Sequence, residues 1–269
     1  MTVPEHEIST RLDRIETEHN VRILHACESG SRAWGFASPD SDWDVRFLYV
    51  HALDWYLSVE ECRDVIELPI ADDLDINGWE LRKALRLMRK SNPVLLEWLH
   101  SPIRYRGDED FLTKMRQLAI DCYSPPACFH HYLHMARGNW REYLRGPTVR
   151  LKKYLYVLRP LLACRWIEAG CGVVPVEFGV LAEAMATAVP LRRAIDELLL
   201  RKQANGELGV GPAIPEIDAF LAAEIGRLSA LVAKLPPARR TENGEDLSRL
   251  LRDCVCSLPP YARVDLAFL

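Results

Sequence analysis

The sequence of 269 residues lacks a long apolar run and a large excess of charge of either sign. Its 34 Lys and Arg residues stand against 38 Asp and Glu residues, which gives a formal net charge of −4. Binding of nucleic acid through bulk charge is therefore not expected, which leaves only a local basic patch for that purpose. The most apolar stretch, residues 154–167, is broken by Arg159, Pro160 and Arg165, so it cannot span a bilayer.

Signals for export and cysteine pairs with metal-binding spacing are also missing. The first twenty residues hold no apolar segment of signal-peptide length. The eight cysteines include no Cys-x-x-Cys pair, and Cys254 and Cys256 form a lone Cys-x-Cys, which is a weak metal motif. With 49% hydrophobic residues, a chain of this length builds a core without disulfides. We therefore expect a cytoplasmic protein with reduced, mostly buried thiols.

The chain changes character at Ser124, Pro125 and Pro126. Short β-rich runs and turns precede this point, and nearly every later segment has helical periodicity. The pattern predicts an α+β protein with a small mixed β-sheet domain over residues 1–124 and an α-helical domain over residues 125–269. Strands are expected at 21–27, 42–49, 63–68 and 74–79, and helices at 30–36, 80–89, 92–99, 129–144, 151–162, 177–188, 191–203, 216–234 and 246–257. Residues 206–215 and 236–244 are expected to be loose connections.

One segment carries recognisable chemistry. Gly30 and Ser31 are followed, after ten residues, by Asp42-Trp43-Asp44. Residues i and i+2 of a strand project to the same side, so Asp42 and Asp44 lie close together and repel each other unless a cation neutralises them. Carboxylates on a rigid strand suit Mg²⁺ or Mn²⁺, and a Gly-Ser turn after a strand approaches a phosphate. The alternative is a polar turn that leads into an edge strand.

A two-metal site normally takes a third carboxylate from a neighbouring strand. Leu74 and Ile76 are expected to face the core, which places Asp73 and Asp75 on the opposite side and excludes Asp72. Strand parity alone does not choose between Asp73 and Asp75.

The Gly-Ser, ten-residue, Asp-x-Asp order resembles the active-site signature of the polymerase-β-like nucleotidyltransferase superfamily. Longer segments resemble a family of predicted bacterial and phage nucleotidyltransferases, some associated with RNA ligases and RNA repair. These segments are ESGSRAWGFASPDSDWDVRFLYV, LDINGWELRKAL, SNPVLLEWL, ARGNWREYLRG and RLKKYLYVLRPLLACRW. The similarity covers residues 22–167, and the sequence past about residue 190 carries no such resemblance.

The resemblance implies a role for each matching residue. Asp42 and Asp44 match the metal-binding pair, and Asp75 matches the third carboxylate. Gly30 and Ser31 match the phosphate-binding turn, beside which Arg32 is expected to contact the nucleotide. The implied reaction is attack of an acceptor hydroxyl on the α-phosphate of a nucleoside triphosphate, with release of pyrophosphate. Because all three carboxylates are present, nothing marks the chain as a non-catalytic member.

Several basic residues have two interpretations. Arg46 shares the side of Asp42 and Asp44, so it either contacts a phosphate or pairs with the carboxylates. Lys152 and Lys153 begin a helix about 100° apart, so one of them reaches the triphosphate across the cleft, or both lie in solvent. The same choice, between a solvated face and a strip that binds RNA, applies to four residues at helical spacing: His130, His134, Arg137 and Arg141.

The acceptor remains open at this stage. The association with RNA repair suggests an RNA 3′ end, and the superfamily also modifies protein hydroxyls and small molecules such as aminoglycosides. There are two alternative functions. One is a regulatory module that binds nucleotide without catalysing its transfer, and the other is an antitoxin-like protein that modifies one specific partner. Trp34, inside the expected nucleotide loop, is either a core anchor or a platform on which a base stacks.

Overall fold

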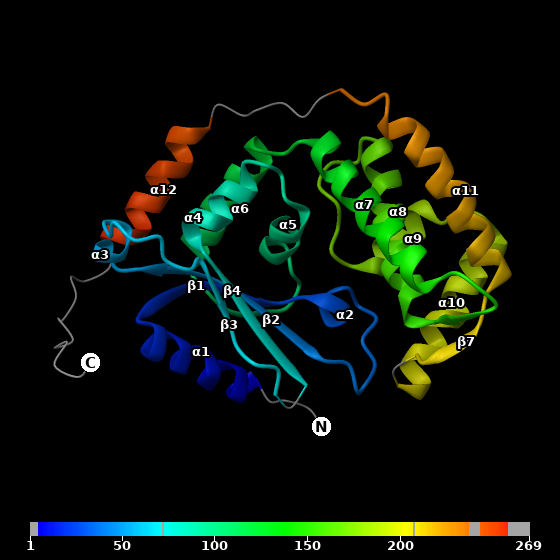
Figure 1. The fold of residues 1–269 in the computed structure, drawn as a ribbon, viewed down its shortest axis with the longest axis horizontal. Coiled ribbons are helices and arrows are strands. Elements are labelled where there is room, and N and C mark those ends of the chain that lie inside the picture. Colours follow the sequence, from blue (N-terminus) through cyan, green and yellow to red (C-terminus); the bar gives the residue numbers. More distant parts are fainter. Residues whose placement is uncertain (1–4, 72, 207, 237–242, 258–269) are drawn as a thin grey trace.

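The computed structural model describes residues 5–71, 73–206, 208–236 and 243–257. The strands of its main sheet are β1 (Val21–Glu28), β2 (Trp43–His51), β3 (Val65–Glu67), β4 (Leu74–Glu80) and β5 (Arg104–Gly107). They lie in the order β3-β4-β2-β1-β5, with β2 parallel to β4 and the other neighbouring pairs antiparallel (Figure 1). Together with the helices described below, this sheet confirms the predicted α+β class.

One face of the sheet is covered by α1 (Glu5–His19), which lies beneath the sheet in Figure 1. Ile8, Leu12 and Ile15 are spaced by four and three residues, so they lie on one side of this helix. All three are buried in one cluster with Val45 and Phe47 of β2. The sequence pattern of β2 thus sends its odd-numbered residues toward α1 and its even-numbered residues to the opposite face.

The opposite face is covered by α4 (Leu81–Met88), α5 (Pro93–Leu99), α6 (Glu109–Asp121) and α12 (Gly244–Cys256). Leu48 and Val50 of β2 belong to the core cluster that these helices share. Asn92 begins α5, where its side chain accepts hydrogen bonds from the N–H groups of Val94 and Leu95. Because α12 contacts α4, α6 and β2, a segment from the end of the chain completes the cover of the sheet.

The remaining helices stand beside the sheet as a second group (Figure 1). They are α7 (Pro125–Tyr143), α8 (Lys152–Glu168), α9 (Phe178–Met185), α10 (Val189–Asn205) and α11 (Pro215–Val232). A small two-stranded antiparallel sheet of β6 (Thr148–Arg150) and β7 (Val210–Pro212) joins the start of α8 to the segment after α10. One hydrophobic cluster runs through both groups, and the division after residue 124 stays a prediction.

The structure differs from the expected elements in several places. The strands β5, β6 and β7 and the helices α1 and α6 were not predicted, and the expected connection at 206–215 contains β7. The helix expected at 30–36 is the short α2 (Gly30–Ala33), and a further turn of helix, α3 (Leu53–Tyr56), follows β2. β6 and β7 were missed because each has three residues and pairs with a distant segment. Asp72 and residues 237–242 lie outside the described residues.

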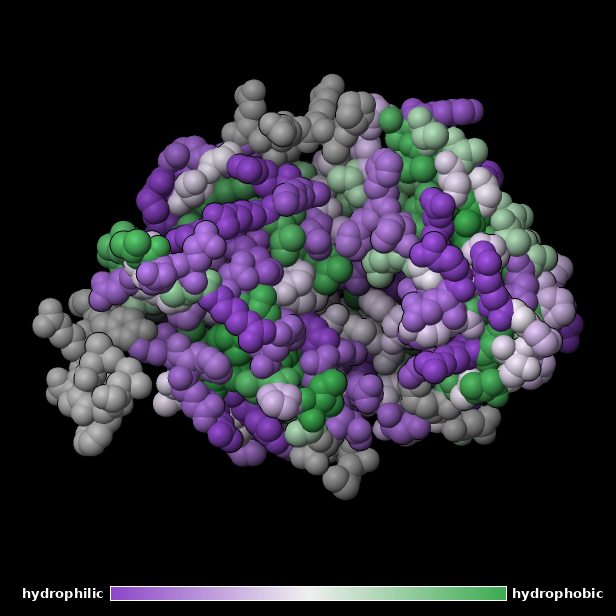
Figure 2. Space-filling view, in the orientation of Figure 1, coloured by the Kyte–Doolittle hydropathy of each residue, from purple (hydrophilic) through white to green (hydrophobic). Residues whose placement is uncertain are grey.

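The surface that faces the reader in Figure 2 is largely hydrophilic, with hydrophobic residues recurring at its right-hand side over α11. None of the helices in the described part of the chain is long and apolar enough to cross a membrane.

Candidate active site

Asp44 and Asp75 are neighbours across the two parallel strands. They are register partners of β2 and β4. Leu74 and Ile76 are buried, as expected, and Asp75 projects to the other side with Asp44. Asp73 is exposed and precedes β4 with a positive φ of 62°, outside the regular strand. The geometry thus brings Asp75 beside Asp44 and leaves Asp73 at the surface.

Arg46 lies between these two carboxylates. Its Nη2 donates to Asp44 Oδ1 at 2.9 Å and to Asp75 Oδ2 at 2.7 Å. Its Nη1 donates to the backbone oxygens of Val45, at 3.0 Å, and Asp75, at 2.9 Å. Of the two interpretations of Arg46, the structure shows the ion pair. Asp42 is exposed and directly precedes β2, which begins at Trp43 and not at residue 42 as expected.

The carboxylates form a site that retains excess negative charge. Burial raises the pKa of Asp44, Arg46 lowers it, and the charges of Asp75 and Asp42 raise it again. In the described residues, no three His, Cys, Asp or Glu side chains already converge on a point where a metal would sit. The oxygen atoms of Asp44 and Asp75 nevertheless fit a divalent cation. The positive guanidinium of Arg46 already lies where these two carboxylates meet.

Glu28 is a buried residue that the sequence analysis missed. Its side chain is fully buried, and it accepts the Asp44 N–H at 2.8 Å and the Tyr105 hydroxyl at 2.6 Å. Burial raises the pKa of Glu28, and these two hydrogen bonds lower it. The available signal was a glutamate at the end of a mostly apolar strand, two residues before Gly30. Glu28 fixes the backbone at Asp44.

Gly30 allows the turn after β1 to approach the Asp44 carboxylate. It has a positive φ of 57°, and a Cβ at this position would lie 2.0 Å from Asp44 Oδ2. Ser31 is buried, and the Ser29 N–H donates to the Asp44 backbone oxygen at 2.8 Å. The predicted phosphate turn and the predicted metal pair are therefore in direct contact.

Arg32 holds the chain that leads into β2. Its Nε donates to the Asp42 backbone oxygen at 3.1 Å, and its Nη2 donates to the Ser41 backbone oxygen at 2.7 Å. The guanidinium lies 3.8 Å from the centroid of the Trp43 ring. These contacts place Arg32 next to Asp42 and tie it to the backbone of the carboxylate segment.

Trp34 connects this turn to the second group of helices. Its indole N–H donates to Glu97 at 3.1 Å, and its backbone oxygen accepts the Phe178 N–H at 2.8 Å. The Tyr156 ring meets it edge-on at 5.4 Å, and the Arg159 guanidinium lies 4.6 Å from its centroid. Trp34 is therefore a packed anchor, held by hydrogen bonds of both its indole N–H and its backbone oxygen.

A buried ion pair between Glu97 and Arg159 contacts Trp34. Arg159 is 2% exposed, and its Nη1 lies 2.7 Å from Glu97 Oε1. The same carboxylate oxygen accepts the Tyr132 hydroxyl at 3.0 Å, and the Val176 backbone oxygen accepts two further N–H groups of Arg159. A buried pair with this many partners is strongly destabilised when one member is removed. No sequence motif predicted a pairing of Glu97 with Arg159, which lie 62 residues apart.

Lys153 points along the side of α8 that leads to Trp34. Its ammonium lies 4.3 Å from the centroid of the Tyr143 ring and 4.9 Å from that of Tyr156, which in turn contacts Trp34. Lys152 is half-exposed and projects about 100° away around the helix. Four residues at helical spacing on α7 are exposed: His130, His134, Arg137 and Arg141.

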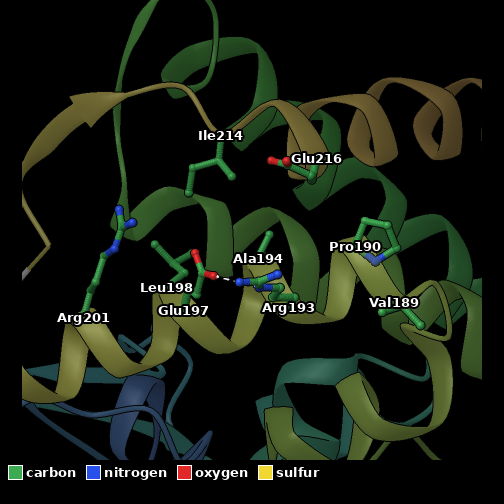
Figure 3. Close-up of a pocket in the computed structure, with 9 residues that line it drawn as sticks. All are labelled: Val189, Pro190, Arg193, Ala194, Glu197, Leu198, Arg201, Ile214 and Glu216. Carbon is green, nitrogen blue, oxygen red and sulfur yellow. Dashed lines mark hydrogen bonds and ion pairs between the residues drawn. The ribbon is translucent and has the colours of Figure 1, made fainter.

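A separate groove of about 390 Å³ runs between α10 and the start of α11 (Figure 3). Arg193 and Glu197 pair along α10, and Ile214 and Glu216 line the opposite side (Figure 3). None of the carboxylates described above lines this groove. We place the candidate active site at Asp44 and Asp75 because charge and converging polar groups meet there.

Comparisons with known proteins identify the family of this chain. The model of a family described as the RNA repair pathway DNA polymerase beta family matches residues 5–253. The chain belongs to this family. The match confirms the resemblance drawn from the motifs, and membership supports nucleotidyltransferase activity in general.

The chain is also similar to named proteins. It is 46% identical over 248 residues to the uncharacterized protein YcgL of Bacillus subtilis (strain 168), covering 92% of this chain and 95% of that one. The crystal structure of a nucleotidyltransferase-like protein from Exiguobacterium sibiricum 255-15 aligns over 93% of this chain and 89% of the other, with 14% identity and a TM-score of 0.29.

Proposed function

We propose that this family member is a metal-dependent nucleotidyltransferase that moves a nucleoside monophosphate from a nucleoside triphosphate to an acceptor hydroxyl. The observation that carries the proposal is the pairing of Asp44 and Asp75 across two parallel strands, in contact with the Gly30 turn. A carboxylate pair beside a Gly-Ser turn fits a metal-bound phosphate, and the family supports the reaction class.

Each residue has a defined task in this proposal. Asp42, Asp44 and Asp75 bind Mg²⁺ or Mn²⁺, which supplies positive charge to the triphosphate when bound. Arg46 leaves its position between the carboxylates and turns its guanidinium to a phosphate oxygen. Asp75 takes the proton of the acceptor hydroxyl as the new O–Pα bond forms. The Pα–O bond to the β-phosphate breaks, and pyrophosphate carries away the electron pair.

The triphosphate lies on the Gly30-Ser31 turn and reaches toward α8. Arg32 contributes positive charge beside the turn, although its guanidinium is also bonded to the backbone of Ser41 and Asp42. We assign the β- and γ-phosphates to Lys153 rather than Lys152, because its ammonium lies on the side of α8 that contacts Trp34. In this proposal the helices after residue 124 form the second wall of the cleft.

The acceptor that we propose is the 3′ hydroxyl of an RNA strand. The family description, which names an RNA repair pathway, supports an RNA acceptor. A protein hydroxyl or a small molecule would use the same metal chemistry, so these two acceptors are outcomes of the test below. A regulatory module that binds nucleotide without turnover is a third outcome.

The test is incubation of the purified chain with each of four α-labelled nucleoside triphosphates, Mg²⁺ or Mn²⁺, total RNA and a cell lysate. We expect label in RNA together with pyrophosphate release, and neither with the Asp44→Asn variant, which keeps the shape of the side chain. Label in protein or in a small molecule would reject RNA as the acceptor and keep the transferase. Nucleotide binding without pyrophosphate release by the unmodified chain would reject the transferase.

A further inference from the structure

A row of aromatic rings and cations follows the end of α7 and the start of α8. The Arg145 guanidinium lies 5.1 Å from the centroid of the Trp140 ring, and that of Arg150 lies 5.5 Å from the centroid of Tyr143. The ammonium of Lys153, on α8, lies 4.3 Å from the centroid of the same Tyr143 ring. These rings and positive groups lie on α7, the loop after it, β6 and the start of α8.

The row concentrates positive charge in a chain that is acidic overall. Residues 140–153 contain five cations, which are Arg141, Arg145, Arg150, Lys152 and Lys153, against the single carboxylate of Glu142. The whole chain has a net charge of −4. Burial and the charge of Lys152 lower the pKa of Lys153, Glu142 raises it, and Arg150 lowers it again. A group of like charges of this density favours a polyanion at this surface.

The row leads to the candidate active site. Tyr156, at its inner end, contacts Trp34 at a centroid distance of 5.4 Å. Trp34 directly follows α2, and Gly30 at the start of α2 touches Asp44. Figure 1 shows α2 on the side of the sheet that faces α7 and α8. A chain of nucleotides on the row would therefore end beside the carboxylates.

We propose that the rings of Trp140 and Tyr143, with Arg145 and Arg150, form a binding platform for the last unpaired nucleotides of a single-stranded RNA acceptor. The platform rests on the proposed function, since it presents a 3′ end to the same site. Unpaired bases stack on aromatic rings and on guanidinium planes, while the cations contact phosphates. In a duplex the base faces are already stacked, so the platform discriminates against paired ends.

The platform differs from the strip of exposed residues farther up α7. His130 and His134 are exposed and contact no aromatic ring among the described residues in this way, whereas a guanidinium lies over each of the Trp140 and Tyr143 rings. The competing role for Tyr143 is mechanical: its contacts with Arg150 and Lys153 would only hold α7 against α8. The test therefore needs a readout that a mechanical contact does not change, namely the preference for single over double strands.

The experiment compares binding of a labelled 12-nucleotide single-stranded RNA and its blunt duplex by fluorescence anisotropy. We expect the unmodified chain to prefer the single strand. Tyr143→Leu, which keeps apolar volume without the ring, should weaken single-strand binding about 5- to 100-fold, and Tyr143→Phe should retain it. Arg145→Ala combined with Arg150→Ala should make the slope of log affinity against log salt less negative by about 1.4, because two phosphate contacts are lost. Melting temperature is the control for folding of each variant, and triphosphate affinity is the control for the double arginine variant.

The outcomes separate this inference from the proposed function. Equal binding of both RNAs by the unmodified chain, or unchanged single-strand binding in Tyr143→Leu, would overturn the platform even if nucleotidyl transfer occurs. If Tyr143→Leu unfolds, an unchanged salt slope in the double arginine variant would overturn it instead. A Tyr143-dependent preference for single strands without pyrophosphate release would support the platform and reject the transferase.

Discussion

Arg46 reaches from β2 to Asp75 on β4 and donates hydrogen bonds to both its carboxylate, at 2.7 Å, and its backbone oxygen, at 2.9 Å. The same guanidinium lies 2.9 Å from Asp44. Arg46 therefore serves as the counter-charge of two carboxylates that our proposal assigns to a divalent cation. A metal that binds there competes with Arg46, and this competition has measurable consequences.

The first prediction concerns that competition. Arg46→Met removes the counter-charge, so the metal-free protein should lose about 1–3 kcal/mol of unfolding free energy as two part-buried carboxylates are left together. Mn²⁺ should raise the melting temperature of this variant more than that of the unmodified chain. Thermal unfolding with EDTA and with Mn²⁺ measures both. Arg63→Met is the control, because Arg63 forms an exposed ion pair with Glu67. Equal shifts in all three proteins would contradict the competition.

The second prediction uses two glycines that both have a positive φ. Gly30 and Gly35 have positive φ values of 57° and 80°, so alanine costs each position roughly 1 kcal/mol of strain. An added Cβ at Gly30 meets Asp44 Oδ2 at 2.0 Å, and one at Gly35 meets nothing within 4 Å. Gly30→Ala should therefore lose pyrophosphate release and Mn²⁺ affinity, whereas Gly35→Ala should lose only stability. The two variants would behave alike if the contact with Asp44 had no role.

The third prediction distinguishes the two lysines of α8. Lys153→Ala should weaken triphosphate binding by about 1–3 kcal/mol, the cost of one charge-assisted hydrogen bond. Lys152→Ala should have a clearly smaller effect, because it projects about 100° away around the helix. Isothermal titration with a non-hydrolysable triphosphate measures the difference, with melting temperature as the check on folding. Similar, negligible changes in both variants would place the start of α8 outside the nucleotide site.

The fourth prediction concerns pH and the buried His25. Burial lowers the pKa of His25 from 6.5 to about 4, against a hydrogen bond with the Trp98 backbone that raises it. Between these values the unfolded chain binds more protons than the folded chain, so the free energy of unfolding falls as pH drops from 6.5 to 4. Protonation of His25 lowers the free energy of unfolding by up to about 3 kcal/mol over this pH range. Urea unfolding at pH 7 and pH 5 should show a smaller difference in His25→Gln. If the free energy of unfolding changed equally between pH 7 and pH 5 in both proteins, His25 would not be the source of the pH dependence.

The carboxylate strands could be predicted because their information is local. Alternation along β2 separates Val45 and Phe47 from Asp44, and the structure has that arrangement. On β4 the same reasoning stopped at Asp73 or Asp75, since parity cannot show where a strand begins. The resemblance selected Asp75, and the register of β2 and β4 places it beside Asp44.

The supports around the site depend on distant contacts that no local pattern contains. Glu97 and Arg159 are 62 residues apart, and Glu28 meets Tyr105 across 77 residues. Trp34 could be singled out from its place in the turn, but only the fold shows its contacts with Glu97 and Tyr156. By contrast, α1 has a regular apolar spacing that was present in the sequence and was overlooked.

The most direct test of the central claim is the initial rate of pyrophosphate release by Asp75→Asn compared with Asp73→Asn, at saturating triphosphate and Mn²⁺. Both changes remove one carboxylate from the same short segment, but only Asp75 pairs with Asp44 and Arg46. We predict that Asp75→Asn lowers the rate by about 100-fold or more, whereas Asp73→Asn stays within about twofold of the unmodified chain. A full rate in Asp75→Asn, or an equal loss in Asp73→Asn, would contradict the account.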